Sequence, residues 1–148
     1  MSRSSSYFKG EKFNALAKKE GYRSRAAYKL IQIQKDFKLI KSGDNILDLG
    51  SSPGGWSQVA SSILKGTGSI IAIDILPMKK INNVDFHQID LNDMHKVDIL
   101  ESSIVLSDIA PNISGVNVID NENMISLLEI EISIVDKFLQ IGGKYLCK

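Results

Sequence analysis

Four short runs of mostly apolar residues recur along the chain, at 45–50, 69–74, 84–90 and 103–109. Their sequences are NILDLG, SIIAID, VDFHQID and SIVLSDI, and most of them are apolar at successive positions. Strands that are apolar on both faces are typical of a parallel sheet buried between layers of helices. The pattern therefore predicts four buried parallel strands.

Helical periodicity fills the intervals between these strands. One helix is predicted over 54–66, where Gly66 provides the stop, and a longer one over 122–142, which ends at the Gly142–Gly143 pair. Strands that alternate with helices predict an α/β fold with a mostly parallel, doubly wound sheet. Ligands of such sheets bind outside the carboxyl ends of the strands, where several of the acidic residues of this chain stand.

The N-terminal part differs in character from the rest. Residues 1–23 are rich in Ser, Lys and Arg with little apolar periodicity, so we expect a mobile or loosely helical basic arm before a domain over 24–148. An amphipathic helix is predicted over 25–41, with Ser24 as its N-cap.

Charge is unevenly distributed along the chain. Residues 1–41 hold eleven Lys and Arg against three acids, a net charge of +8, and residues 42–148 hold seven against fourteen, a net charge of −7. A basic segment beside an acidic domain is typical of a protein that docks a polyanion at one end, and a solvated basic tail is the alternative.

Composition narrows the class further. A chain of 148 residues with a net charge of +1 is the size of one globular domain. It contains no run near the roughly 20 apolar residues that a membrane span requires and no signal-peptide pattern, so we expect a cytoplasmic protein. Cys147 is the single cysteine, and with only His87 and His95 beside it no zinc-type ligand cluster is expected.

The loop Gly50–Gly55, with sequence GSSPGG, leaves the first strand and opens a helix. Small residues there allow a ligand to approach main-chain N–H groups. The loop has neither the Gly-Lys-Ser/Thr of a P-loop nor the G-x-G-x-x-G of dinucleotide enzymes. Asp74 follows about 20 residues later at the end of the second strand, where a carboxylate can accept ribose hydroxyls. The pattern favours an adenosine ligand, and a tight turn with a surface acid is the alternative.

Five motifs follow one another along the chain: RSRAAYKL, DLGSSPGGWSQVA, AIDILPM, SDIAPNISG and IGGKYLCK. In this order, and at comparable intervals, they resemble the motifs of the FtsJ-like ribosomal RNA 2′-O-methyltransferases, from about Arg23 to the last residue. The resemblance implies a Rossmann-like methyltransferase fold with S-adenosylmethionine as cofactor. It also implies methylation of a uridine ribose in large-subunit ribosomal RNA.

The resemblance also implies roles for individual residues. It implies cofactor contacts at Gly54, Trp56, Asp74, Asp90 and Asp108. For Trp56 a place in the core is an equal alternative, and Asp90 could be an exposed strand-end acid.

Three members of the family's catalytic Lys-Asp-Lys-Glu tetrad correspond to Lys29, Asp108 and Lys148. A ribose hydroxyl must lose its proton to a general base as it is methylated, and lysine can serve only when it is neutral. We expect mutual repulsion between Lys29 and Lys148 to favour that form, with Asp108 orienting the base. Judged without the motif, Lys29 is a solvated charge on a helix rich in lysine.

The chain departs from the family pattern at its C-terminal end, because the glutamate of the tetrad and the final strands are absent. We therefore expect a C-terminally incomplete domain whose fifth strand, at the final GGKYLCK of residues 142–148, is an exposed edge that invites self-association. A catalytically impaired remnant that binds S-adenosylmethionine or RNA is the alternative function. A nucleotide-dependent oxidoreductase is a third, although the missing G-x-G-x-x-G counts against it.

Ribosomal RNA is the expected partner, within the assembled large subunit. We expect the basic arm and the first helix to contact phosphates and to read no bases, so that binding weakens steeply with salt. The expected contacts are Arg3, Lys9, Lys12, Lys18, Lys19, Arg23 and Arg25.

Overall fold

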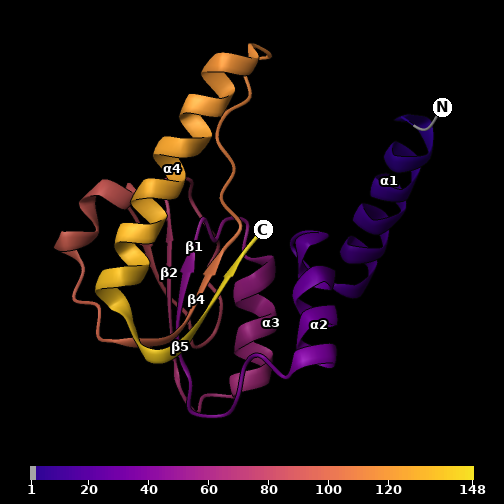
Figure 1. Ribbon diagram of the computed structural model, residues 1–148. Coiled ribbons are helices and arrows are strands. Elements are labelled where there is room, and N and C mark those ends of the chain that lie inside the picture. The colour runs from indigo at the N-terminus through magenta and orange to yellow at the C-terminus, as the bar shows by residue number, and fades with distance from the viewer. Residues whose placement is uncertain (1–2) are drawn as a thin grey trace.

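The structure is a computed structural model that describes residues 3–148, with side chains described from residue 10 onward (Figure 1). The side chains of Arg3 and Lys9, two of the expected RNA contacts, therefore lie outside the described part. The helices are α1 (Arg3–Glu20), α2 (Ala26–Phe37), α3 (Gly55–Leu64) and α4 (Asn117–Phe138), with a 3₁₀ helix η1 at Leu91–Lys96. The strands are β1 (Asn45–Leu49), β2 (Ser69–Asp74), β3 (Asp85–Gln88), β4 (Ser102–Ser107) and β5 (Leu139–Cys147).

The five strands form one parallel sheet in the order β3-β2-β1-β4-β5. Figure 1 shows α2 and α3 on one side of this sheet and α4 on the other. From β1 the chain first builds outward through β2 and β3, and it then returns to add β4 and β5 on the other side of β1. The switch point between β1 and β4 is where an open α/β sheet forms its ligand crevice. The predicted doubly wound α/β fold is confirmed.

Alternate residues of the central strands build two separate cores. Ile46 of β1 points to the α2 and α3 side, where it joins Leu30 and Trp56 in one buried cluster. Leu47 points to the other side, where it joins Ile134 in a second cluster below α4. Because both faces of β1 are buried, its apolar residues Ile46, Leu47 and Leu49 include neighbours that point to opposite faces, as expected for a central parallel strand.

The strand predictions at 45–50 and 69–74 agree with β1 and β2 to within one residue, and those for β3 and β4 agree within two. The first amphipathic helix differs more. It ends at Phe37, because Lys38 adopts a left-handed conformation with φ of 48°. The prediction that Ser24 caps it was wrong, since Arg25 occupies the N-cap position and no side chain caps the helix.

The last helix also differs from its prediction. It begins at Asn117 and ends at Phe138, and the Gly142–Gly143 pair lies inside β5, so its prediction as a helix stop was wrong. Pairing with β4 overrides the helical pattern from Leu139 onward, a tertiary effect that outweighs local propensity. Gly142 has φ of 79° within an irregular strand, which a glycine accommodates.

The N-terminal basic segment forms the continuous helix α1. It rests on α2 through aromatic contacts, with the ring centroids of Phe13 and Tyr28 5.8 Å apart and those of Tyr22 and Tyr28 5.5 Å apart. Ala17 is buried at this junction. The domain boundary after residue 23 stays a prediction.

The surface of α4 is unusually apolar for an exposed helix. Val118, Ile125 and Ile132 repeat at seven-residue intervals and are all exposed. Among the helices of residues 3–148, none combines the length and hydrophobicity that a bilayer span requires.

Candidate active site

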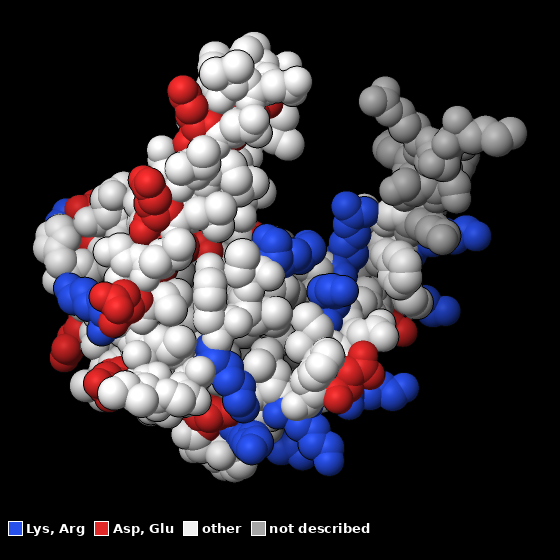
Figure 2. Space-filling view, in the orientation of Figure 1, with Lys and Arg blue, Asp and Glu red and all other residues white. Residues whose placement is uncertain are grey.

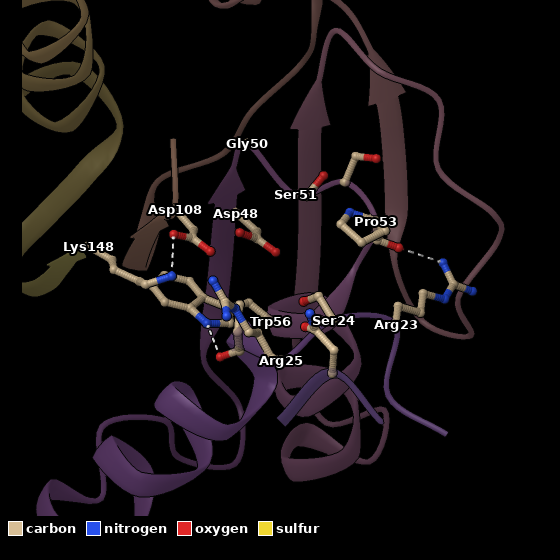
Figure 3. Close-up of a pocket in the computed structure, with 14 residues that line it drawn as sticks. Arg23, Ser24, Arg25, Asp48, Gly50, Ser51, Pro53, Trp56, Asp108 and Lys148 are labelled. Atoms are coloured by element: carbon tan, nitrogen blue, oxygen red, sulfur yellow. Dashed lines mark hydrogen bonds and ion pairs between the residues drawn. The ribbon is translucent and has the colours of Figure 1, made fainter. Parts of the chain in front are cut away.

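Two cavities open at the carboxyl ends of the strands, and Gly50 lines both. The first, of about 340 Å³, lies between the loop after β1 and the start of α2 (Figure 3). The second, of about 380 Å³, lies on the α4 side of the same loop. The side chains that carry charge or hydrogen-bonding groups into the first cavity include Arg25, Asp48, Ser51, Trp56, Asp108 and Lys148.

Gly50 forms the bridge between the two cavities, and glycine is required there. Its φ is +68°, and a Cβ added to it would stand 2.4 Å from the Cγ1 atom of Ile109. Any side chain would therefore meet the segment after β4. The main chain of this loop runs close to Ile73, whose carbonyl accepts from the N–H groups of Gly50 and Ser51 at 2.8 and 3.1 Å.

Asp48 is a buried acid at the base of the first cavity, with 1% of its surface exposed. Its pKa is raised to about 7, chiefly by burial and to a lesser extent by the nearby carboxylates of Asp108 and Asp74, whereas a hydrogen bond from the Ser57 hydroxyl opposes the change. A buried carboxylate in this state gains most from a cationic group placed beside it.

The first cavity also contains a buried hydroxyl that lacks a partner. Ser51 is 5% exposed, and among the described residues its Oγ atom has no hydrogen-bond partner. Buried polar groups are satisfied in most folded proteins, so an orphaned hydroxyl facing a cavity indicates a group that a ligand satisfies.

Asp108 and Lys148 meet at the mouth of the first cavity. The Nζ atom of Lys148 lies 3.2 Å from Oδ1 of Asp108, and Figure 3 shows the two side chains pointing toward each other above Trp56. The main chains hold this approach, because the Lys148 N–H donates to the Ser107 carbonyl at 3.0 Å. The structure thus brings together two of the three predicted catalytic residues.

Lys29, the third predicted catalytic residue, is not among the residues that line either cavity. It is exposed on α2, one helical turn after Arg25, which does line the first cavity. The spacing of four residues places both on the same side of the helix. Lys29 is therefore on the same side of α2 as Arg25, and its catalytic role stays a prediction.

The second cavity holds the other two predicted acids. Asp74 and Asp90 line it together. Both carboxylate oxygens of Asp74 are fixed by main-chain donors, Oδ2 by Ser52 at 2.8 Å and Oδ1 by Leu76 at 2.9 Å. Oδ1 of Asp90 accepts from the main chain and side chain of Asn92, both at 2.8 Å. The two acids are thus held at one end of the crevice, beyond Gly50.

Two further residues of the predicted cofactor set have structural duties. Trp56 is 3% exposed within the α2 and α3 core, and its Nε1 donates to the Ala26 carbonyl at 2.8 Å, although it also lines the first cavity. Gly54 has φ of +114°, and a Cβ there would stand 2.8 Å from the Cδ1 atom of Ile81. Gly54 lines neither cavity, whereas Gly55 lines the first.

The sequence pointed to the Gly50–Gly55 loop and to Asp48 as an acid at the end of a strand, but it gave no individual role to Asp48, Ser51 or Gly50. A carboxylate near the carboxyl end of a buried strand is unusual, and that was the signal for Asp48. Nothing in the sequence separates Ser51 from Ser52, whose hydroxyl donates to the Pro77 carbonyl at 3.0 Å.

Comparison with known proteins finds relatives over most of the chain. Residues 22–148 match the model of the family described as FtsJ-like methyltransferase. Ribosomal RNA large subunit methyltransferase E of Coxiella burnetii is 43% identical over 143 residues, which span 89% of this chain and 68% of that protein. The protein of the same name from Anaplasma marginale is 44% identical over 142 residues, 90% of this chain and 70% of that one.

A solved structure extends the similarity to three dimensions. A crystal structure from Plasmodium falciparum, assigned as a ribosomal RNA methyltransferase, is 31% identical to this chain and superposes with a TM-score of 0.77. The superposition covers 85% of this chain and 77% of that one.

Proposed function

This chain belongs to the FtsJ-like methyltransferase family, and we propose that it transfers a methyl group from S-adenosylmethionine to the 2′-hydroxyl of a uridine ribose in large-subunit ribosomal RNA. The observation that carries the proposal is the pairing of Asp108 with Lys148 in a cavity that also contains the buried Asp48. The proposal places the chain in the cytoplasm, with the ribosomal subunit as its partner.

The residues present fit S-adenosylmethionine. Its adenosine end matches the second cavity, where the carboxylate of Asp74 can accept both ribose hydroxyls and Asp90 lies beside it. Its methionine end carries an ammonium group and a sulfonium sulfur, and both positive charges suit the first cavity with Asp48 and Asp108. Ser51 supplies a free hydroxyl there. When bound, the cofactor supplies an electrophilic methyl group on sulfur.

Lys148 and Asp108 would manage the proton of the attacking hydroxyl. That hydroxyl must lose its proton as the new C–O bond forms, and an amine accepts a proton only when it is neutral. In the free chain the Nζ atom of Lys148 lies 3.2 Å from Oδ1 of Asp108. From this position the neutral amine of Lys148 would take the proton, with Lys29 approaching from α2.

The RNA would approach over α1 and α2. Figure 2 shows Lys and Arg side chains gathered over these helices and the hollow beside them, and Asp and Glu side chains along α4. Lys12, Lys18, Lys19 and Arg25 are all exposed on this basic side. Contacts of this kind bind phosphate without reading sequence, so affinity should fall steeply as salt is raised.

The edge of the sheet provides a second surface for the assembled state. Within residues 3–148, β5 pairs only with β4, and Ile141 on it is fully exposed. An unpaired apolar edge is a template for another strand. We propose that copies of this chain associate through β5 at high concentration, which sedimentation velocity over a concentration series tests directly.

One experiment tests the activity and separates it from the alternative of a non-catalytic binding protein. The chain is titrated with S-adenosylmethionine in a calorimeter and then given tritiated cofactor and large ribosomal subunits that lack the modification. Digestion of the RNA and chromatography of the nucleosides identify the labelled product. Label in 2′-O-methyluridine supports the proposal. Binding without transfer supports the binding protein, and the absence of binding contradicts both.

A further inference from the structure

We propose that Arg23 is a positioning residue that joins the glycine loop to the segment after β2 and so holds the cofactor crevice in its binding geometry. The inference rests on the proposed function for the identity of the ligand. It replaces the phosphate contact expected for Arg23 with a different role, and it leaves that contact to Arg25.

The guanidinium of Arg23 is engaged by the main chain on two sides. Its Nη1 atom donates to the Pro53 carbonyl at 3.3 Å and to the Lys79 carbonyl at 2.5 Å, and its Nη2 atom donates to the Lys80 carbonyl at 2.8 Å. Figure 3 shows the side chain turned toward Pro53 and away from Asp108 and Lys148. A planar fork of donors that spans two loops is a task that arginine performs and lysine cannot.

The main chain of Arg23 is fixed as well. Its N–H donates to Oε1 of Gln58 on α3 at 2.8 Å, and Nε2 of the same glutamine donates to the Gly21 carbonyl at 3.1 Å. The turn between α1 and α2 is therefore tied to α3 before the side chain reaches out. The main chain of Arg23 is therefore held in place, and this fixes the position from which its guanidinium reaches the two loops.

Both loops that Arg23 joins shape the crevice. Pro53 lines the first cavity, and the segment 77–81 follows Asp74 and Ile75, which line the second. The two loops meet tightly at Gly54, where an added Cβ would lie 3.2 Å from the Cδ atom of Arg23 and 3.1 Å from the Sδ atom of Met78. Loss of the guanidinium would loosen this contact and, with it, the main-chain donors that hold Asp74.

Arg25 provides the contrast within the same short segment. Like Arg23 it lines the first cavity, but it is exposed, and the described hydrogen bonds and ion pairs of the structure include none from its guanidinium. The two arginines, separated by one residue, therefore have different environments. The guanidinium of Arg23 donates to main-chain carbonyls, whereas that of Arg25 is exposed to solvent. This difference makes the inference testable by substitution.

The test compares Arg23→Ala and Arg23→Lys with Lys35→Ala, which removes one exposed charge from α2 outside both cavities. Hydrogen exchange of the free chain measures the opening of residues 50–55 and 77–82, and calorimetry measures binding of S-adenosylhomocysteine. We expect both Arg23 variants to exchange faster in both loops and to bind roughly tenfold or more weakly, with lysine rescuing little. Lys35→Ala should match the unmodified chain.

The outcomes separate this inference from the proposed function. If the unmodified chain fails to bind the nucleoside, the proposed function fails, while the exchange comparison still tests the role of Arg23. If the unmodified chain binds and both Arg23 variants bind and exchange as it does, the inference is overturned. If Arg23→Lys restores full binding, charge and not the forked geometry matters, and the inference is overturned as well.

Discussion

The hydroxyl of Ser57 on α3 donates a 2.5 Å hydrogen bond to the carboxylate of Asp48 on β1, and both side chains are closed off from solvent. One hydroxyl is a small compensation for a buried charge, because transfer of an ion from water costs far more than a single hydrogen bond returns. The raised pKa of Asp48, about 7, is the direct result.

Stability should therefore fall as pH rises through the range in which Asp48 ionises. Between about pH 4 and about pH 7 the folded chain retains a proton that the unfolded chain has released, so the free energy of unfolding decreases as pH increases, by on the order of 4 kcal/mol at most. Asp48→Asn removes this dependence. Urea unfolding at about pH 5 and about pH 8 measures it, with the exposed Asp98→Asn as control. If the unfolding free energy changed equally between the two pH values in Asp48→Asn and in the unmodified chain, Asp48 would not be the group responsible.

Lys148→Met should abolish methyl transfer while S-adenosylmethionine still binds. The substitution keeps much of the side-chain length but removes the amine that lies 3.2 Å from Asp108, and loss of a general base costs about 100-fold or more. The control is Lys144→Met on β5, the strand that leads to Lys148; the amine of Lys144 donates to the Leu39 carbonyl at 2.8 Å, and Lys144 lines neither cavity. Single-turnover transfer of labelled methyl measures the effect. Equal loss in both variants would mean that β5, and not the amine, had been damaged.

Gly50→Ala should destabilise the chain more than Gly115→Ala. Both glycines have positive φ, so both substitutions bear a backbone cost of about 1–2 kcal/mol. Only at Gly50 would the new methyl group also meet Ile109, at 2.4 Å, whereas nothing lies within 4 Å at Gly115. The difference between the two unfolding free energies isolates that contact, which overpacking estimates put at about 1–3 kcal/mol. Equal destabilisation would show that the segment after β4 yields freely.

Trp56→Phe should lower stability by about 1–3 kcal/mol, because the Ala26 carbonyl loses its donor while most of the ring packing remains. Thermal unfolding measures this change.

Trp56 is also the single tryptophan of the chain and lines the first cavity, so its fluorescence reports on the surroundings of that cavity. We expect added S-adenosylmethionine to change the emission of the unmodified chain. No change at saturating cofactor would argue that the ligand occupies the second cavity only.

The parallel sheet could be predicted because its central strands contain runs of consecutive apolar residues, as β4 does from Ile104 to Leu106. The end of α4 could not be predicted, because residues 139–141 suit either a helix or a strand. Pairing with β4 is what makes them part of a strand. A glycine pair that often ends a helix here lies inside an irregular strand.

The site was predictable to the extent that strand ends and the glycine loop define it. Asp74, Asp90 and Asp108 were selected because each stands at or near the end of a predicted strand. The separate roles of Arg23 and Arg25 could not be predicted. The two residues are equivalent in the sequence and differ only in which main-chain carbonyls lie within reach of each guanidinium. Contacts between distant loops carry no local signature, so pattern analysis cannot separate such residues.

The basic side on α1 and α2 and the acidic α4 give the molecule an electric dipole out of proportion to its net charge of +1. In the field of a polyanion a nearly neutral protein of this kind feels little pull but a strong torque. The protein would therefore rotate before contact, so that the first cavity faces the nucleic acid. Salt would slow association by weakening this alignment, even where the overall attraction is small.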